Sequence, residues 1–122
     1  MAHIKKILIV DDSFNNLLLL EDLLTEMSYH VISAHNGIEA MEKIESENPD
    51  LILLDVMMPK MGGFEMMEKM NEAQIKIPVI IITAKSTEEE KHKALSLGAA
   101  DFIAKPVIIT EILEKIEEIF LK

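Results

Sequence analysis

Leu51-Ile52-Leu53-Leu54, followed by Asp55, is the stretch that decides the fold. An uninterrupted apolar run of this length is typical of a strand that helices cover on both faces, because a half-exposed strand alternates apolar and polar side chains. The segment from Val79 to Thr83 has the same character. Further short runs rich in apolar residues are Ile7 to Val10, Val31 to Ala34 and Asp101 to Ala104. The sequence therefore predicts five short strands.

Stretches with helical periodicity separate these strands. Apolar residues recur every three or four positions in 17–27 and again in 109–119, where glutamates occupy the other face. Weaker helical patterns cover about 38–47, 64–72 and 87–97, the last ending at Gly98 as a C-cap. Strand and helix thus alternate five times, which predicts a doubly wound α/β fold with a parallel sheet. At 122 residues the chain is expected to form a single domain over 1–122.

Composition excludes several classes of protein. A hydrophobic fraction of 49% excludes a disordered chain, and the absence of cysteine excludes a disulfide scaffold, a thiolate zinc site and a cysteine nucleophile. The net charge of −10 would repel nucleic acid and anionic membranes. No apolar run approaches the roughly 20 residues of a membrane span, and none is long enough for a signal peptide. A cytoplasmic location is therefore expected.

Polar side chains end the predicted strands. Asp11 and Asp12 follow the first, Asp55 the third, Thr83 the fourth and Lys105 the fifth. Because the carboxyl ends of parallel strands meet at one edge of the sheet, these side chains should converge. Carboxylates about 4 Å apart repel by roughly 4 kcal/mol at an effective dielectric of 20, which a divalent cation would relieve. Oxygen ligands without histidine suit Mg²⁺ or Mn²⁺, so the edge is predicted to bind metal and handle a phosphoryl group.

Each of these residues could instead have an ordinary structural role with no part in metal or phosphoryl chemistry. The acidic pair or Ser13 could cap the first helix, and Asp55 could begin a turn. Thr83 could simply end a strand, and Lys105 could extend into solvent. In the functional interpretation, Asp55 is a nucleophile toward phosphorus, while Thr83 and Lys105 contact the phosphoryl oxygens.

Five ordered segments carry a family resemblance. They are Ile7-Leu8-Ile9-Val10-Asp11-Asp12-Ser13, Leu54-Asp55-Val56-Met57-Met58-Pro59, Gly63, Ile82-Thr83-Ala84-Lys85 and Gly98-Ala99-Ala100-Asp101-Phe102-Ile103-Ala104-Lys105-Pro106. At these spacings the chain resembles, from about Ile4 to Leu121, the receiver domain of two-component response regulators. The resemblance is to a stand-alone regulator of the chemotaxis or phosphorelay kind, although a receiver cut from a longer transcription factor or hybrid kinase would look the same.

The resemblance implies a flavodoxin-like (β/α)5 fold with strand order 2-1-3-4-5. It implies that Asp55 accepts a phosphoryl group from a phosphohistidine of a sensor kinase or histidine phosphotransfer protein. Mg²⁺, or Mn²⁺ in its place, would be bound by Asp12, Asp55 and the Met57 carbonyl, with Asp11 acting through water. The domain would be a signalling phosphoacceptor that assists its own phosphorylation and dephosphorylation, not an enzyme in the usual sense.

The resemblance also implies a switch. Phe102 would move inward when Thr83 is drawn to the phosphate, and the Lys105–Pro106 bond would be cis. The output would pass to a protein target through the fourth helix, fifth strand and fifth helix, in a monomer or a phosphorylation-dependent dimer. Asn15 and Asn16 lie on the first-helix surface that should meet the phosphodonor.

Met57 and Lys85 stand where members of the family tune self-dephosphorylation. Because an apolar Met57 cannot orient a water molecule, slow hydrolysis of the phosphorylated form is predicted.

Three other functions compete with this interpretation. A phosphatase of the haloacid-dehalogenase type also uses a strand-end aspartate, but it needs a second aspartate where this chain has Met57. A flavodoxin-like cofactor binder would need a first loop that attracts phosphate, and Asp11-Asp12 would repel it. An interaction module without phosphorylation would not need the intact acidic set.

The histidines and most of the methionines are predicted to have structural roles and not functional ones. His3, His30, His35 and His92 share no metal-ligand spacing and are expected at the surface. The methionines at 57, 58, 61, 66, 67 and 70 are expected mainly to fill the core.

Overall fold

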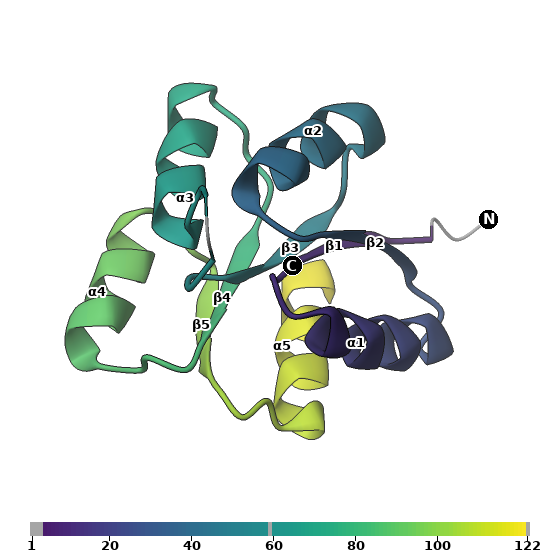
Figure 1. Ribbon diagram of the computed structural model, residues 1–122. Coiled ribbons are helices and arrows are strands. Elements are labelled where there is room, and N and C mark those ends of the chain that lie inside the picture. The colour runs from purple at the N-terminus through teal and green to yellow at the C-terminus, as the bar shows by residue number, and fades with distance from the viewer. Residues whose placement is uncertain (1–3, 59, 122) are drawn as a thin grey trace.

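The computed structural model describes residues 4–58 and 60–121, so His3 and Pro59 lie outside the described residues (Figure 1). Strands and helices alternate along the chain as predicted. The strands are β1 (Lys6–Val10), β2 (His30–Ala34), β3 (Leu51–Asp55), β4 (Val79–Thr83) and β5 (Asp101–Ala104). The helices are α1 (Phe14–Glu26), α2 (Gly37–Glu47), α3 (Gly63–Glu72), α4 (Glu88–Ser96) and α5 (Ile109–Leu121).

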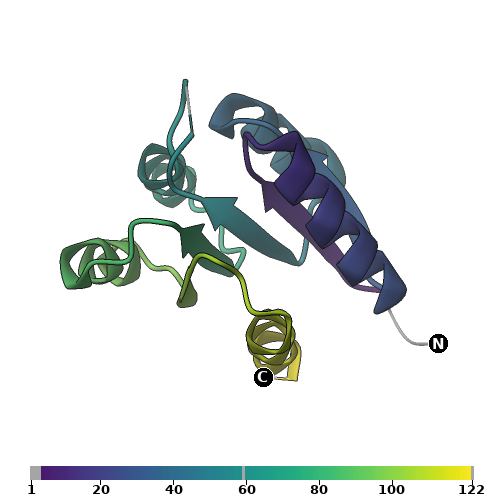
Figure 2. The same cartoon turned by 60° about the horizontal axis from the view of Figure 1, so that its bottom comes forward.

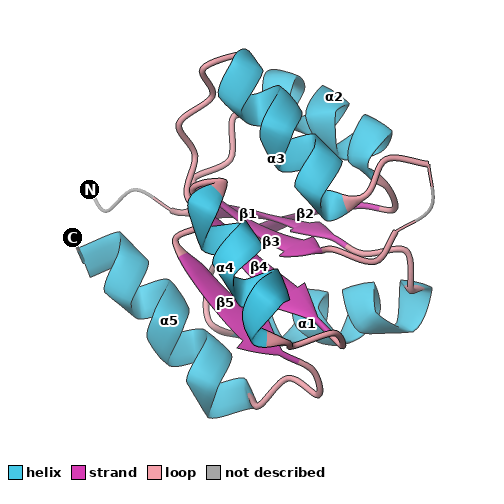
Figure 3. Cartoon of the chain, turned by 90° about the vertical axis from the view of Figure 1, so that its left-hand side faces the viewer, coloured by secondary structure: helices cyan, strands magenta, loops and turns pink. Residues whose placement is uncertain are grey.

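The strands form one parallel sheet in the order β2-β1-β3-β4-β5, which confirms the expected topology. Helices α1 and α5 cover one face, and α2, α3 and α4 cover the other (Figures 2 and 3). From β1 the chain winds outward to β2, whereas from β3 it winds the other way to β4. The winding reverses between β1 and β3, so a crevice is expected at the carboxyl ends of these two strands.

The strands supply two separate cores because successive side chains point to opposite faces. In β3, Ile52 and Leu54 pack toward α2–α4, and Leu51 and Leu53 pack toward α1 and α5. All residues of β3 and β4 are buried, as their unbroken apolar runs predicted. No helix among the described residues is long and apolar enough to span a bilayer.

The N-terminus of α1 is capped by Ser13, whose side chain accepts a hydrogen bond from the Asn16 backbone N–H at 3.3 Å. The two preceding aspartates are therefore not needed as the N-cap, which removes one structural alternative for them. At the end of α4, Gly98 follows the C-cap with φ +99°, the left-handed conformation that favours glycine.

The methionine and histidine predictions are confirmed in part. Met66, Met67 and Met70 are buried in the core on the α2–α4 side. Met57 is 58% exposed, because it lies in the loop after β3 and not on a helix that faces the sheet. The three described histidines are exposed: His30, His35 and His92.

Gly63 lets the start of α3 pack directly against the end of β3. A Cβ atom at Gly63 would lie 2.8 Å from the Val56 Cα and 2.9 Å from the Asp55 carbonyl oxygen. Both are backbone atoms, so the clash can be relieved only by moving the chain beside Asp55. A Cβ atom at Gly62 would lie 3.4 Å from its nearest neighbour, the Val56 carbonyl oxygen, which is an ordinary contact distance.

We therefore expect Gly63→Ala to lower the free energy of unfolding by about 2 kcal/mol, because overpacking against backbone cannot relax cheaply. Gly62→Ala is the matched control and should lower it by less than about 1 kcal/mol, the modest cost of alanine at the N-cap of α3. Urea denaturation of both variants checks this. Equal stability of the two variants would show that α3 does not depend on this close approach.

Candidate functional site

Strand register places Asp11 and Asp55 side by side. Val10 is paired with Leu54; Asp11 directly follows the end of β1, and Asp55 is the last residue of β3. Since Val10 and Leu54 point toward α2–α4, the pleat directs both aspartates toward α1 and α5. Lys105 comes directly after β5 and two residues after Ile103, which faces α1 and α5, so the Lys105 side chain points to that same face. The three side chains therefore reach one crevice at the carboxyl edge.

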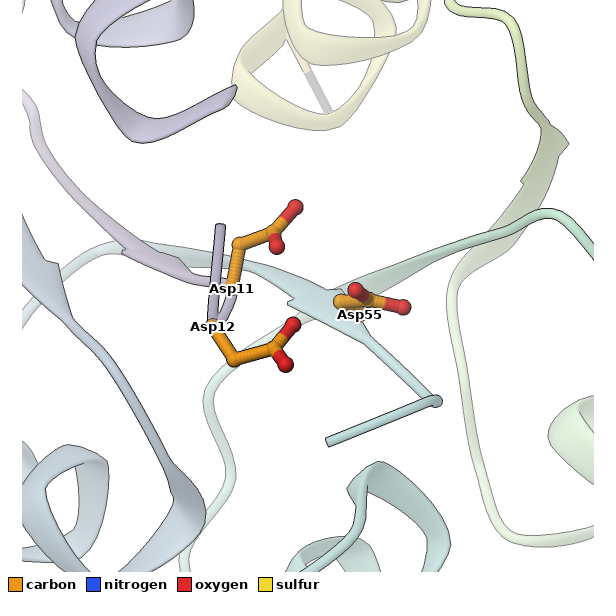
Figure 4. A group of neighbouring side chains, drawn as sticks. All are labelled: Asp11, Asp12 and Asp55. Carbon is orange, nitrogen blue, oxygen red and sulfur yellow. The ribbon is translucent and has the colours of Figure 1, made fainter. Parts of the chain in front are cut away.

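Three carboxylates converge there (Figure 4). Oxygen atoms of Asp11, Asp12 and Asp55 lie within 4.8 Å of one another. Asp11 and Asp55 are buried, with exposed fractions of 4% and 5%, and Asp12 is exposed. The cluster thus has a buried floor and an open, acidic mouth.

Asp11 is held by donors from three sources. Its Oδ1 accepts a hydrogen bond from the Ser13 backbone N–H at 2.9 Å. Its Oδ2 accepts from the Asn16 side-chain amide at 3.2 Å and from the Lys105 ammonium at 3.4 Å. From the sequence, Asn16 was predicted only to lie on the phosphodonor surface. Its position in the first turn of α1, just after the acidic pair, is the signal that could have placed its side chain in the site.

Asp55 is held by a backbone donor and by the same lysine. Its Oδ1 accepts from the Met57 N–H at 3.0 Å, and its Oδ2 accepts from the Lys105 ammonium at 3.3 Å. Burial, together with the charge of Asp11, raises the pKa of the Asp55 carboxyl group, although the Met57 N–H and Lys105 work in the opposite direction. The carboxylate form of Asp55 is therefore costly in the absence of a further cation.

The ammonium of Lys105 bridges Asp11 and Asp55. Burial lowers the Lys105 pKa, but the two carboxylates outweigh it and leave the pKa above its usual value. The lysine is therefore charged, and one ammonium stands beside three carboxylates.

This local excess of negative charge and the all-oxygen donor set fit a hard divalent cation such as Mg²⁺, which accepts carboxylates, carbonyl oxygens and water as ligands. Neither cysteine nor histidine belongs to the cluster, so nothing in it favours zinc.

Thr83 and Phe102 lie on the opposite face of the sheet from Lys105. Thr83 ends β4 fully buried, and its hydroxyl accepts from the Lys85 N–H at 3.1 Å. Phe102 is paired with Ile81 in the neighbouring strand, and both pack toward α2–α4. Thr83 and Phe102 are thus diagonal neighbours on one face, close enough for the movement of one to affect the other. The Lys105–Pro106 peptide bond is cis.

Comparison with known proteins agrees with this geometry. The family profile described as the response regulator receiver domain matches residues 7–117. The chain belongs to this family. It is 41% identical over 115 residues to the alkaline phosphatase synthesis transcriptional regulatory protein PhoP of Bacillus subtilis, covering 94% of this chain and 48% of that protein. It is 41% identical over 114 residues to the response regulator ArlR of Staphylococcus aureus, covering 93% and 52%.

Solved structures show the same receiver fold. A CheX–CheY–BeF3–Mg²⁺ complex from Borrelia burgdorferi superimposes with a TM-score of 0.91 at 32% identity, covering 97% of this chain and 90% of that one. A CheY-like receiver domain protein from Methanospirillum hungatei gives a TM-score of 0.89 at 35% identity, covering 95% and 93%. The receiver domain spans about half the length of the curated relatives described above. The family assignment disfavours the aspartate-nucleophile phosphatase.

Proposed function

We propose that this receiver domain accepts a phosphoryl group on Asp55 from a phosphohistidine of a sensor kinase or histidine phosphotransfer protein. The observation that carries the proposal is the buried Asp55 carboxylate, which is bound by Lys105 and lies within 4.8 Å of two further carboxylates. A carboxylate oxygen of Asp55 attacks phosphorus, the bond from phosphorus to the donor imidazole nitrogen breaks, and the imidazole leaves with the electron pair. No base is needed at neutral pH, because the nucleophile is used as the carboxylate.

The other residues of the site then stabilise charge. We propose that Asp12, Asp55 and the Met57 carbonyl hold Mg²⁺, or Mn²⁺ in its place, with Asp11 acting through water. When bound, the ion neutralises phosphoryl oxygens. Lys105, already directed at Asp55, donates to another phosphoryl oxygen. We propose that the Thr83 hydroxyl, which accepts from the Lys85 N–H, turns to donate a hydrogen bond to a third phosphoryl oxygen. Phe102, on the same face of the sheet, then moves with Thr83.

The phosphodonor is proposed to approach beside α1. A cavity of about 390 Å³ opens between α1 and the start of α5, with Asp11, Asp55 and Lys105 at its polar end. Leu19 and Ile109, both lining this cavity, are 70% and 56% exposed. An apolar surface directly beside the nucleophile supports docking of a protein donor there. We propose that residues 1–122 act as one receiver domain in the cytoplasm, with output through α4, β5 and α5 to a protein target.

Incubation with phosphoramidate and Mg²⁺ tests the chemistry, since this small donor also transfers phosphorus from nitrogen. The expected product is an acyl phosphate on Asp55 that hydroxylamine removes and that peptide mapping locates. Peptide mapping that places the phosphoryl group on a serine or a histidine would contradict the proposal. Turnover of small phosphate esters would instead support the phosphatase.

Slow loss of the phosphoryl group is a further expected outcome. Met57 is exposed next to Asp55 and its thioether cannot orient an attacking water. Met57→Gln supplies an amide that can, and should shorten the lifetime of the phosphorylated form by roughly tenfold. Met27→Gln, at an exposed methionine at the end of α1, is the control. A wild-type lifetime of seconds, or no change in the Met57 variant, would refute this role.

A further inference from the structure

A second groove lies between α2 and α3, on the face of the sheet opposite α1 and α5. It measures about 930 Å³ and has an apolar floor. Ile38 is 51% exposed there. The apolar residues that line it are Ile38, Met41, Ile44, Met61, Ala73, Ile75 and Ile77. None of the residues proposed for phosphoryl transfer lines this groove.

The two walls of the groove carry opposite charge. Glu42 and Glu45 line it on the α2 side, and Lys69 and Lys76 line it on the α3 side. All four are exposed, and none forms an ion pair within 4.0 Å with any other residue that the structure describes. An apolar strip is therefore flanked by an acidic wall and a basic wall, neither of which is neutralised by an ion pair with the residues that the structure describes.

The two walls run in register. Gly37 begins α2 and is so close to Met61 that a Cβ atom on it would lie 2.7 Å from the Met61 Cβ. Because α3 begins only two residues after Met61, the two helices start side by side. At 1.5 Å per residue, Glu42 lies roughly 8 Å along α2 and Lys69 roughly 9 Å along α3. Glu45 lies in the last turn of α2 and Lys76 follows the end of α3 by four residues, so this second pair lies toward the other end of the groove.

We propose that this face binds a second copy of the same face. Both helices return from the carboxyl edge of a parallel sheet and so run in the same direction. A two-fold axis along them lays α2 of each copy over α3 of the other. It brings Glu42 opposite Lys69 and Glu45 opposite Lys76, and symmetry makes each contact twice. A face with one acidic and one basic wall is complementary to itself in this arrangement, which favours a second copy over an unrelated partner.

This dimer leaves the other surfaces of the receiver domain free. The Asp55 crevice opens beside α1, and the proposed output face is formed by α4, β5 and α5. Because none of the residues proposed for phosphoryl transfer lines the groove, we expect the association not to require phosphorylation. The net charge of −10 on each copy opposes it, so the dimer is weak and forms at high protein concentration.

Sedimentation equilibrium over micromolar to millimolar concentrations tests the proposal. The wild-type protein should show a monomer–dimer equilibrium. Reversing one wall, by Glu42→Lys with Glu45→Lys or by Lys69→Glu with Lys76→Glu, should weaken self-association by about tenfold or more. Mixing the two reversed proteins should restore association, because one then presents two basic walls and the other two acidic walls.

Two further variants separate this surface from general charge effects. Glu68→Lys with Glu72→Lys changes the net charge of the wild type as much as the α2 reversal, at residues of α3 outside the groove, and should leave association intact. Ile38→Ser removes exposed apolar surface without touching the charges and should weaken it. A wild type that stays monomeric throughout, a dimer that either reversal leaves unchanged, or a mixture that does not recover would each overturn the proposal.

Discussion

Lys105→Met is expected to slow phosphorylation of Asp55 by about 100-fold, the usual cost of removing one donor aimed at developing charge. The same change should raise the affinity of the metal-free protein for Mg²⁺ by about tenfold. The Lys105 ammonium lies 3.4 Å from an Asp11 oxygen and 3.3 Å from an Asp55 oxygen, so it competes with a cation for these carboxylates. Methionine preserves the length of the side chain and removes only its charge and donors.

Two measurements check the Lys105 prediction. The first is the rate of phosphorylation as a function of phosphoramidate concentration, and the second is the affinity for Mg²⁺, measured by calorimetry. Lys115→Met is the matched control, because the Lys115 ammonium is similarly half-buried and lies 3.0 Å from an Asp101 oxygen, outside the site. The control should change both quantities by less than about threefold. A slower Lys105 variant with unchanged or weaker Mg²⁺ binding would mean that the lysine supports the fold of the site and does not compete with the ion.

Asp55→Asn is expected to raise the free energy of unfolding by about 1 to 2 kcal/mol at neutral pH in a chelator-containing buffer. Asparagine keeps an oxygen for the Met57 N–H and removes a buried negative charge that burial and Asp11 make unfavourable. Added Mg²⁺ should stabilise the wild-type protein more than the variant, because a ligand stabilises the folded state more when it binds more tightly, and the variant lacks one carboxylate of the cluster.

The pH dependence of this difference has a definite sign. The Asp55 pKa is about 3.8 in the unfolded chain and is raised above this value in the folded protein. Between the unfolded and the folded pKa, the folded state therefore binds more protons than the unfolded state. The contribution of Asp55 to stability is therefore fully present below about pH 3.8 and is lost as pH rises through the folded pKa. The advantage of Asp55→Asn should be small in acid and grow toward neutral pH.

Urea denaturation at several pH values, with and without Mg²⁺, measures both effects. Asp22→Asn, at an exposed aspartate of α1, is the control and should shift stability by less than about 0.5 kcal/mol in either condition. If Asp55→Asn and the wild type unfold alike in all conditions, the carboxylates are not crowded and the basis for a cation site is lost.

Most of the fold could be predicted from the sequence because two signals are strong here. Unbroken apolar runs such as Leu51 to Leu54 identify buried parallel strands, and the three-and-four spacing in 109–119 identifies a helix. Once the strands are parallel, their carboxyl ends must share an edge. The approach of Asp11, Asp55 and Lys105 to one another followed from that rule.

Details that depend on helix placement could not be predicted. The Asn16 amide reaches Asp11 from the first turn of α1, and the sequence left open whether Ser13 or an aspartate caps that helix. Met57 was expected in the core with its neighbouring methionines, yet the chain leaves the sheet before it. The charged groove between α2 and α3 combines residues from 38 to 77, and no local pattern brings them together.

The most direct test of the central claim is the intact mass of the protein after incubation with acetyl phosphate, with and without Mg²⁺, for the wild type and for Asp55→Asn. The predicted result is a gain of one phosphoryl group in the wild type that needs Mg²⁺, is removed by hydroxylamine and is absent from the variant. A variant that gains the same hydroxylamine-labile mass, or a folded wild type that binds Mg²⁺ but neither gains mass nor releases phosphate from the donor, would contradict phosphoryl transfer to Asp55.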